Sequence, residues 1–135
     1  MRILIDSDYY IATLAPDDSN KSKAQKAYDL IFETGSSVSL LTTWDVIDEV
    51  TTKLSYFISK EVASEFFKYI GRSDTLIIYP TERYLEPVYS LFNSIKSKNV
   101  SLTDCFNAVV FKEYEIDYIL SFDKDYKKLG VKIWE

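Results

Sequence analysis

Short apolar runs alternate along the chain with longer segments in which apolar residues recur every three to four positions. The runs are typical of buried strands, and the longer segments are typical of amphipathic helices. The predicted strands are residues 3–5, 37–41, 76–79, 118–122 and 131–134. The predicted helices, with their capping residues, are 9–14, 19–35, 42–57, 59–71, 82–97 and 101–114.

Strands that alternate with helices predict βαβ units and a mostly parallel sheet covered on both faces. No linker, repeat or low-complexity tract divides the chain. We therefore expect one domain over residues 1–135, an α/β fold built as a three-layer α/β/α sandwich around a central, mostly parallel sheet of four to five strands. In such sheets ligands bind beyond the carboxyl ends of the strands, so the residues that follow each strand are the candidates for function.

Acidic residues occupy these positions. Asp6 follows the first strand and Asp123 follows the fourth, and each has a further acid two residues on, Asp8 and Asp125. Asp104 stands in the first turn of the helix at 101–114, which we expect to begin at the same edge of the sheet. The pattern predicts a cluster of carboxylates there.

A fourth acid is expected from the helix at 42–57. Its apolar side chains, which share one quadrant of the helix, are Val46, Ile47, Val50, Leu54 and Phe57. Asp48 lies nearly opposite that quadrant, in solvent, whereas Glu49 lies at its flank and can reach over the sheet edge. Glu49 is therefore the predicted fourth acid, and Asp45, one turn earlier, is at best an outer residue of the site.

Composition narrows the chemistry of such a cluster. The chain has no histidine, one cysteine (Cys105) and three glycines, which excludes histidine-based triads, imidazole or multi-thiolate zinc sites and a glycine-rich phosphate loop. Two unit charges about 4 Å apart repel by about 4 kcal/mol at an effective dielectric of about 20. Converging carboxylates therefore favour a hard cation, Mg²⁺ or Mn²⁺, and such ions serve phosphoryl chemistry by activating water.

The net charge of −5, from 21 acids and 16 bases, argues against a generic duplex-binding protein. It does not argue against an enzyme whose acids surround a metal ion. No apolar run approaches the roughly 20 residues of a membrane span, and Asp6 comes too early for a signal peptide. We expect a cytoplasmic protein with no membrane segment.

Four segments carry a resemblance to a known family. They are Ile3-Leu4-Ile5-Asp6-Ser7, Asp45-Val46-Ile47-Asp48-Glu49-Val50, Ser101-Leu102-Thr103-Asp104 and Leu120-Ser121-Phe122-Asp123-Lys124-Asp125-Tyr126. In this order they resemble the motifs of PIN-domain ribonucleases, in particular VapC-type toxins of toxin–antitoxin pairs. The resemblance covers nearly the whole chain. One departure is Asp8, which stands where the family more often has Asn, Ser or an apolar residue.

The resemblance implies a metal-dependent endoribonuclease that cuts single-stranded or loop RNA and leaves a 5′-phosphate and a 3′-hydroxyl. It implies Mg²⁺ or Mn²⁺ as cofactor, bound by Asp6, Glu49, Asp104 and Asp123 as the metal-binding and catalytic residues. The partners expected are RNA, a small antitoxin protein and a second copy of the chain in a homodimer. The residues expected around this site are Ser7, Ser121 and Asp125 behind the ligands, and Lys124, Lys127 and Lys128 against RNA phosphates.

Other interpretations of the same residues stay open. Asp104, three residues after Ser101, also fits a helix capping box, and Asp6 fits a helix cap. A non-catalytic PIN-like module that binds RNA or serves as a scaffold would keep the fold, and a haloacid-dehalogenase-type phosphatase would use Asp6 and Asp8. A receiver domain is disfavoured, because it needs an aspartate after the third strand, which residues 76–81 lack.

Overall fold

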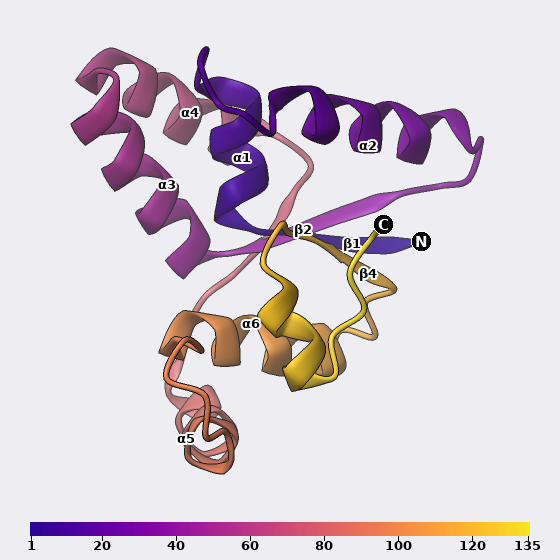
Figure 1. Cartoon of the computed structure of the whole chain (residues 1–135), viewed down its shortest axis with the longest axis vertical. Coiled ribbons are helices and arrows are strands. Elements are labelled where there is room, and N and C mark those ends of the chain that lie inside the picture. The colour runs from indigo at the N-terminus through magenta and orange to yellow at the C-terminus, as the bar shows by residue number, and fades with distance from the viewer.

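Four short strands form one parallel sheet in the computed structural model, which describes all 135 residues (Figure 1). The strands are β1 (Arg2–Ile5), β2 (Ser39–Thr43), β3 (Leu76–Ile78) and β4 (Tyr118–Leu120), in the order β3-β2-β1-β4. The helices are α1 (Ser7–Leu14), α2 (Lys21–Glu33), α3 (Trp44–Phe57), α4 (Lys60–Arg72), α5 (Leu85–Ser94) and α6 (Leu102–Glu113). Two 3₁₀ helices are η1 (Glu82–Tyr84) and η2 (Lys124–Leu129).

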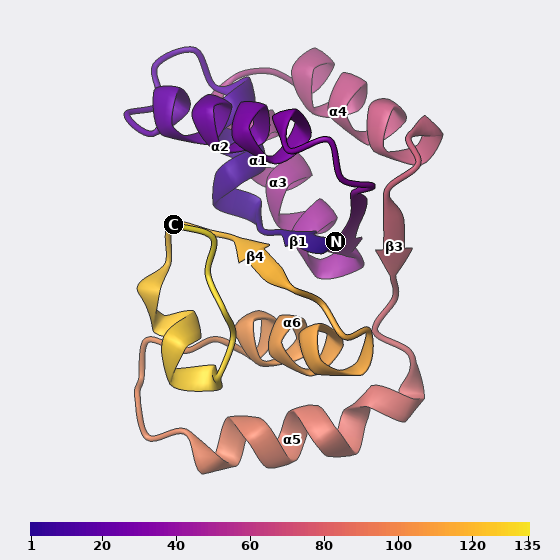
Figure 2. The same ribbon diagram turned by 90° about the vertical axis from the view of Figure 1, so that its right-hand side faces the viewer.

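The sheet lies between two helical layers. Helices α1–α4 cover one face, and α5 and α6 with η2 cover the other (Figure 2). Successive side chains of β1 point to opposite faces, so Ile3 and Ile5 join the core under α1–α4 while Leu4 joins the core under α5 and α6. This double burial explains the uninterrupted apolar run of the first strand and confirms the expected three-layer α/β fold.

The starts of three helices follow from capping residues. The hydroxyl of Thr43 accepts a hydrogen bond from the Val46 amide at the start of α3, and that of Ser59 accepts one from Val62 at the start of α4. Ser101 forms a capping box at the start of α6. Each side chain satisfies an amide that has no partner within its helix, which is why the predicted starts are correct.

Some predicted boundaries are wrong. β2 begins two residues late, at Ser39, because its register with β1 pairs Ser39 with Arg2. Residues 131–134 make one isolated bridge, Ile119 with Ile133, and no fifth strand. Gly71 lies inside α4, which ends at Arg72, where the Ser73 amide caps the carbonyls of the last turn. No helix combines the length and the apolar character that a membrane crossing requires.

Candidate active site

Asp6 lies at the point where β1 passes into α1. Its Oδ1 accepts a hydrogen bond from the Ser7 amide at 2.8 Å, so it caps the helix, and its Oδ2 accepts one from the Ser121 hydroxyl at 2.8 Å. Only 7% of the residue is exposed. Ser121 directly follows β4, the strand beside β1, so two neighbouring strand ends hold this carboxylate in place.

Asp8, on the first turn of α1, connects this helix to the end of β4. Its Oδ2 accepts hydrogen bonds from the Phe122 amide at 2.8 Å and from the Ser121 hydroxyl at 3.2 Å. Its Oδ1 is buried and has no partner. The sequence pattern places Asp8 beside Asp6 without assigning it to the predicted metal site.

Asp123 and Asp104 complete the acidic group, and both also cap helices. Asp123 accepts a hydrogen bond from the Asp125 amide at 2.8 Å at the start of η2, and its own amide donates to the Ser121 hydroxyl at 3.1 Å. Asp104 accepts one from the Ser101 amide at 2.9 Å, and its own amide donates to the Ser101 hydroxyl. The capping role of Asp104 is therefore real and coexists with its place near the other acids.

The Ser121 hydroxyl lies against Asp6, Asp8 and the Asp123 amide, and the charge of Asp104 also acts on the pKa of Asp6. Burial raises the pKa of Asp6 to about 7, with further contributions from the charges of Asp8 and Asp104. Burial raises the pKa of Asp8 to about 6, and the charge of Asp123 adds to it. The pKa of Asp104 is also raised, mainly by burial and to a smaller extent by Asp123. We refer to Asp6, Asp8, Asp104 and Asp123 as the aspartate cluster.

Glu49 lies on α3, its side chain is 38% exposed, and its Oε1 forms an ion pair with Lys53 at 2.9 Å. No three acidic side chains converge closely enough to form a ready-made metal site. Asp104 adds to the raised pKa of Asp6, and Asp123 to that of Asp104, so these three predicted ligands are neighbours without forming such a site, while Glu49 forms an ion pair with Lys53.

The donors of the aspartate cluster nevertheless suit a hard divalent cation. They are all carboxylate oxygens, one of which is buried without a partner, and no lysine or arginine forms an ion pair with any of the four. Buried carboxylates without a counter-charge are costly, and a cation would offset that cost.

Buried polar side chains connect the elements near this site. Asn107 of α6 accepts a hydrogen bond from the Thr43 hydroxyl at 2.8 Å and donates one to the Tyr126 hydroxyl at 2.9 Å. Burial raises the pKa of Tyr126, as do the nearby charges of Asp6 and Asp104. Neither Asn107 nor Tyr126 is among the site residues predicted from the sequence. In the sequence, Asn107 stands among the apolar residues of α6. A buried amide needs hydrogen-bond partners, so this position could have indicated a buried polar contact.

The other predicted site residues have different surroundings. Ser7 and Ser121 contact Asp6 directly, as described above. Asp125 forms an ion pair with Lys128 at 2.8 Å, and Lys127 forms one with Glu135 at 2.7 Å. Lys124 is exposed and forms no ion pair. Among the three predicted RNA-binding lysines, only Lys124 has a free ammonium group.

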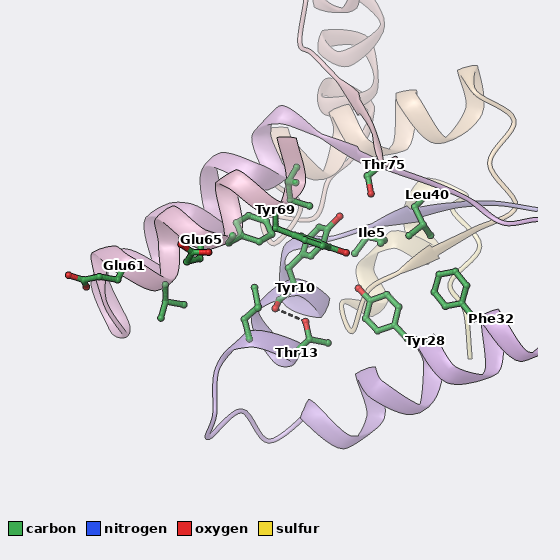
Figure 3. A pocket seen from close by; sticks show the side chains of 14 residues that line it. Ile5, Tyr10, Thr13, Tyr28, Phe32, Leu40, Glu61, Glu65, Tyr69 and Thr75 are labelled. Atoms are coloured by element: carbon green, nitrogen blue, oxygen red, sulfur yellow. Dashed lines mark hydrogen bonds between the residues drawn. The ribbon is translucent and has the colours of Figure 1, made fainter. Parts of the chain in front are cut away.

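An apolar groove of about 670 Å³ lies between α1, α2 and α4, and none of the four aspartates lines it (Figure 3). Ten of its fourteen lining residues are hydrophobic. The Tyr10 hydroxyl is buried there without a partner, and burial raises its pKa. Glu61 and Glu65 extend from α4 at one end. The groove has the apolar lining and few polar groups of a binding surface.

Compared by sequence, the chain matches no family profile and no curated protein. Compared by structure, it is similar to VapC20 of Mycobacterium tuberculosis, a sarcin-ricin loop cleaving toxin, with a TM-score of 0.83, 16% identity and coverage of 96% of this chain and 95% of that one. It is also similar to VapBC2 of Rickettsia felis bound to a promoter DNA fragment, with a TM-score of 0.68, 13% identity and coverage of 100% and 98%. The expected PIN-like fold is therefore confirmed.

Proposed function

We propose that this chain, which has the fold of the VapC toxins, is a metal-dependent endoribonuclease and the toxin of a toxin–antitoxin pair. One observation carries the proposal: the aspartate cluster lies at the carboxyl edge of the sheet, and no base forms an ion pair with any of its members. This edge is where α/β folds bind their ligands. Unpaired carboxylates there favour a cation-dependent reaction on an anionic substrate.

The cofactor of the proposed reaction is Mg²⁺ or Mn²⁺. Asp6, Asp104 and Asp123 are the residues that would hold it, with Glu49 as the fourth ligand predicted from the sequence. When bound, the cation supplies a Lewis acid for the water and the phosphate oxygens. The chain itself keeps Asp6 oriented through the Ser7 amide and the Ser121 hydroxyl, so that this carboxylate needs little reorganisation.

The proposed substrate is single-stranded or loop RNA. Lys124, next to Asp123 and free of ion pairs, is the cation best able to meet a phosphate entering the site. Lys127 and Lys128 must first leave Glu135 and Asp125, and their contribution is correspondingly smaller. The chemistry proposed is in-line attack of water on phosphorus, leaving a 5′-phosphate and a 3′-hydroxyl.

The proposed protein partners are a small antitoxin and a second copy of the chain. The groove between α1, α2 and α4 suits the apolar face of an antitoxin segment, and the buried Tyr10 hydroxyl would gain a hydrogen-bond partner. A homodimer would use exposed apolar side chains elsewhere, such as Leu85 and Tyr89 of α5, which are 72% and 63% exposed.

Cleavage of an end-labelled hairpin RNA tests the activity. We expect cleavage with Mg²⁺ or Mn²⁺, none in EDTA, and at least a hundredfold loss in Asp6→Asn, because electrostatic stabilisation of this kind is worth about 10²–10³ in rate. Asp48→Asn, on an exposed position of α3, is the matched control and should cleave at the wild-type rate.

Three results would contradict the proposal. RNA cleavage that survives EDTA would remove the metal dependence. RNA binding without cleavage by the wild type would favour a non-catalytic PIN-like module. Release of inorganic phosphate from small phosphomonoesters, without RNA cleavage, would favour a phosphatase that uses Asp6 and Asp8.

A further inference from the structure

We propose that Tyr126 is a positioning residue of the candidate active site: its hydroxyl donates a hydrogen bond to the Asp104 carboxylate and orients it for the divalent cation. This inference rests on the proposed metal-dependent function and deepens it, because it assigns a role in the site to a side chain that binds no ion. It depends on a line of buried hydrogen bonds that runs from the start of α3 through α6 to η2.

The bonds in this line all point in one direction. The Val46 amide donates to the Thr43 hydroxyl oxygen at 3.4 Å, and the Thr43 proton is in turn donated to Asn107 Oδ1 at 2.8 Å. The other polar atom of this side chain, Nδ2, can only donate, and it donates to the Tyr126 hydroxyl at 2.9 Å. The oxygen of Tyr126 is therefore an acceptor in this bond, and its own proton points elsewhere.

Burial requires an acceptor for that proton within the protein. Thr43 and Asn107 are completely buried, and Tyr126 is only 1% exposed. A buried donor that has lost its contact with water and gained no partner destabilises the fold. Asn107 Oδ1 already accepts the proton of Thr43, so the acceptor for the Tyr126 proton has to come from another residue.

Asp104 is the residue placed to accept it. It precedes Asn107 by three residues on α6, and side chains at this spacing lie on one helix face with their Cβ atoms about 5–6 Å apart. A hydroxyl that lies 2.9 Å from Asn107 Nδ2 is therefore beside Asp104. The electrostatics agree with this placement, because burial raises the pKa of Asp104 and hydrogen bonds from Ser101 and Tyr126 oppose that rise.

A donor from η2 changes how Asp104 can serve as a ligand. The Ser101 amide holds its Oδ2 at 2.9 Å from the start of the same helix. A second donor from another element restricts the rotation of the carboxylate, so less reorganisation is needed when an ion binds. Because the tyrosine hydroxyl is neutral, it favours the charged carboxylate without taking the place of the cation, as a lysine or arginine would.

Mn²⁺ binding to the full chain, without RNA, tests the inference. Tyr126→Phe keeps the ring and removes the hydroxyl, and isothermal titration calorimetry should show binding weakened about tenfold or more, since residues that orient a metal ligand contribute about 10–100-fold. The matched control is Tyr84→Phe. It removes another bonded hydroxyl from a buried tyrosine, one that accepts from Arg83 and donates to Glu113. It should change the Mn²⁺ affinity less than twofold, although both variants lose stability.

Carbon NMR of the cation-free protein reports the hydrogen bond itself. In chains labelled with ¹³C, the side-chain carboxyl resonance of Asp104 should move in Tyr126→Phe and stay in place in Tyr84→Phe. If Tyr126→Phe fails to fold, Asp104→Asn gives the same test from the other side, because it should move the Cζ resonance of Tyr126.

Two results would overturn the inference and leave the proposed function intact. They are equal Mn²⁺ affinities for wild type and Tyr126→Phe, and resonances of Asp104 and Tyr126 that do not respond to loss of the other side chain. A wild type that binds no Mn²⁺ and cleaves RNA in EDTA would overturn both the inference and the proposed function.

Discussion

The Ser121 hydroxyl contacts groups from both ends of the chain. It donates toward Asp6 and Asp8, and it accepts a hydrogen bond from the Asp123 amide. One buried oxygen thus sets the spacing of three members of the aspartate cluster. The same crowding determines how the cluster responds to pH and to cations, and these responses can be measured residue by residue.

Without a divalent cation, stability should fall as pH rises from about 4 to about 7. The pKa of Asp6 is about 7 in the folded chain, against about 4 for an unfolded aspartate, so the folded state binds more protons in this interval. Urea unfolding in EDTA should give a lower free energy of unfolding at pH 7.5 than at pH 5. Asp6→Asn should flatten this dependence, and an unchanged slope in that variant would contradict the assignment.

Divalent cations should raise the melting temperature through the same residues. Mn²⁺ at 100 times its dissociation constant adds about 2.7 kcal/mol to the free energy of unfolding. Asp104→Asn should reduce this gain and also stabilise the cation-free chain, because it removes one of the charges that repel Asp6. Thermal melts of wild type, Asp104→Asn and the control Asp48→Asn, each with and without Mn²⁺, measure both effects. An asparagine variant with the wild-type response would exclude Asp104 as a ligand.

At the scale of elements, the fully buried Asn107 connects α6 to the start of α3 and to η2. Its partners, Thr43 and Tyr126, come from segments more than eighty residues apart in the chain. Hydrogen bonds between buried side chains are worth most where water cannot replace a lost partner. This connection keeps η2, and with it Asp123, in place beside α6.

Tyr126→Phe should therefore destabilise the fold by about 1–3 kcal/mol, the cost of leaving the Asn107 amide without its acceptor. Chemical unfolding of the cation-free protein measures the loss. The control is Tyr56→Phe, which removes a hydroxyl from a side chain that is 82% exposed. Similar stabilities for both variants would show that the Asn107–Tyr126 hydrogen bond contributes little.

At the scale of the whole molecule, the aspartate cluster and the apolar groove are separate surfaces of one fold. The groove lies within the layer of α1, α2 and α4, whereas the cluster lies at the ends of β1 and β4 (Figures 1 and 3). Helix α1 contributes to both: Asp8 lies on its first turn, and Tyr10, two residues later, lines the groove.

Tyr10→Phe should stabilise the free chain or leave its stability unchanged, because it removes a buried hydroxyl that has no partner. Tyr84→Phe is the control: its hydroxyl accepts a hydrogen bond from Arg83 and donates to Glu113, so its removal should destabilise. The free energies of unfolding of both variants check this. A clear loss of stability in Tyr10→Phe would mean that the hydroxyl is already satisfied in the free protein.

The sequence by itself determined the alternation of the first four strands with helices, the parallel α/β architecture and the caps at Ser59 and Ser101, and it narrowed the cap of α3 to Thr42 or Thr43. These features follow from local signals: side-chain period, and a polar residue beside unpaired helix amides. Because the carboxyl ends of parallel strands share one edge, the sequence also led to Asp6 and Asp123 as neighbours.

Tertiary structure alone decided the rest. Glu49 forms an ion pair with Lys53, and which of the neighbouring charges a partly exposed carboxylate meets is decided only in the folded chain. The hydrogen bonds of Asp8 join segments more than a hundred residues apart. The register of β2 and the single bridge at Ile133 depend on which backbone groups meet across the sheet. Interactions of this kind arise only after the chain has folded.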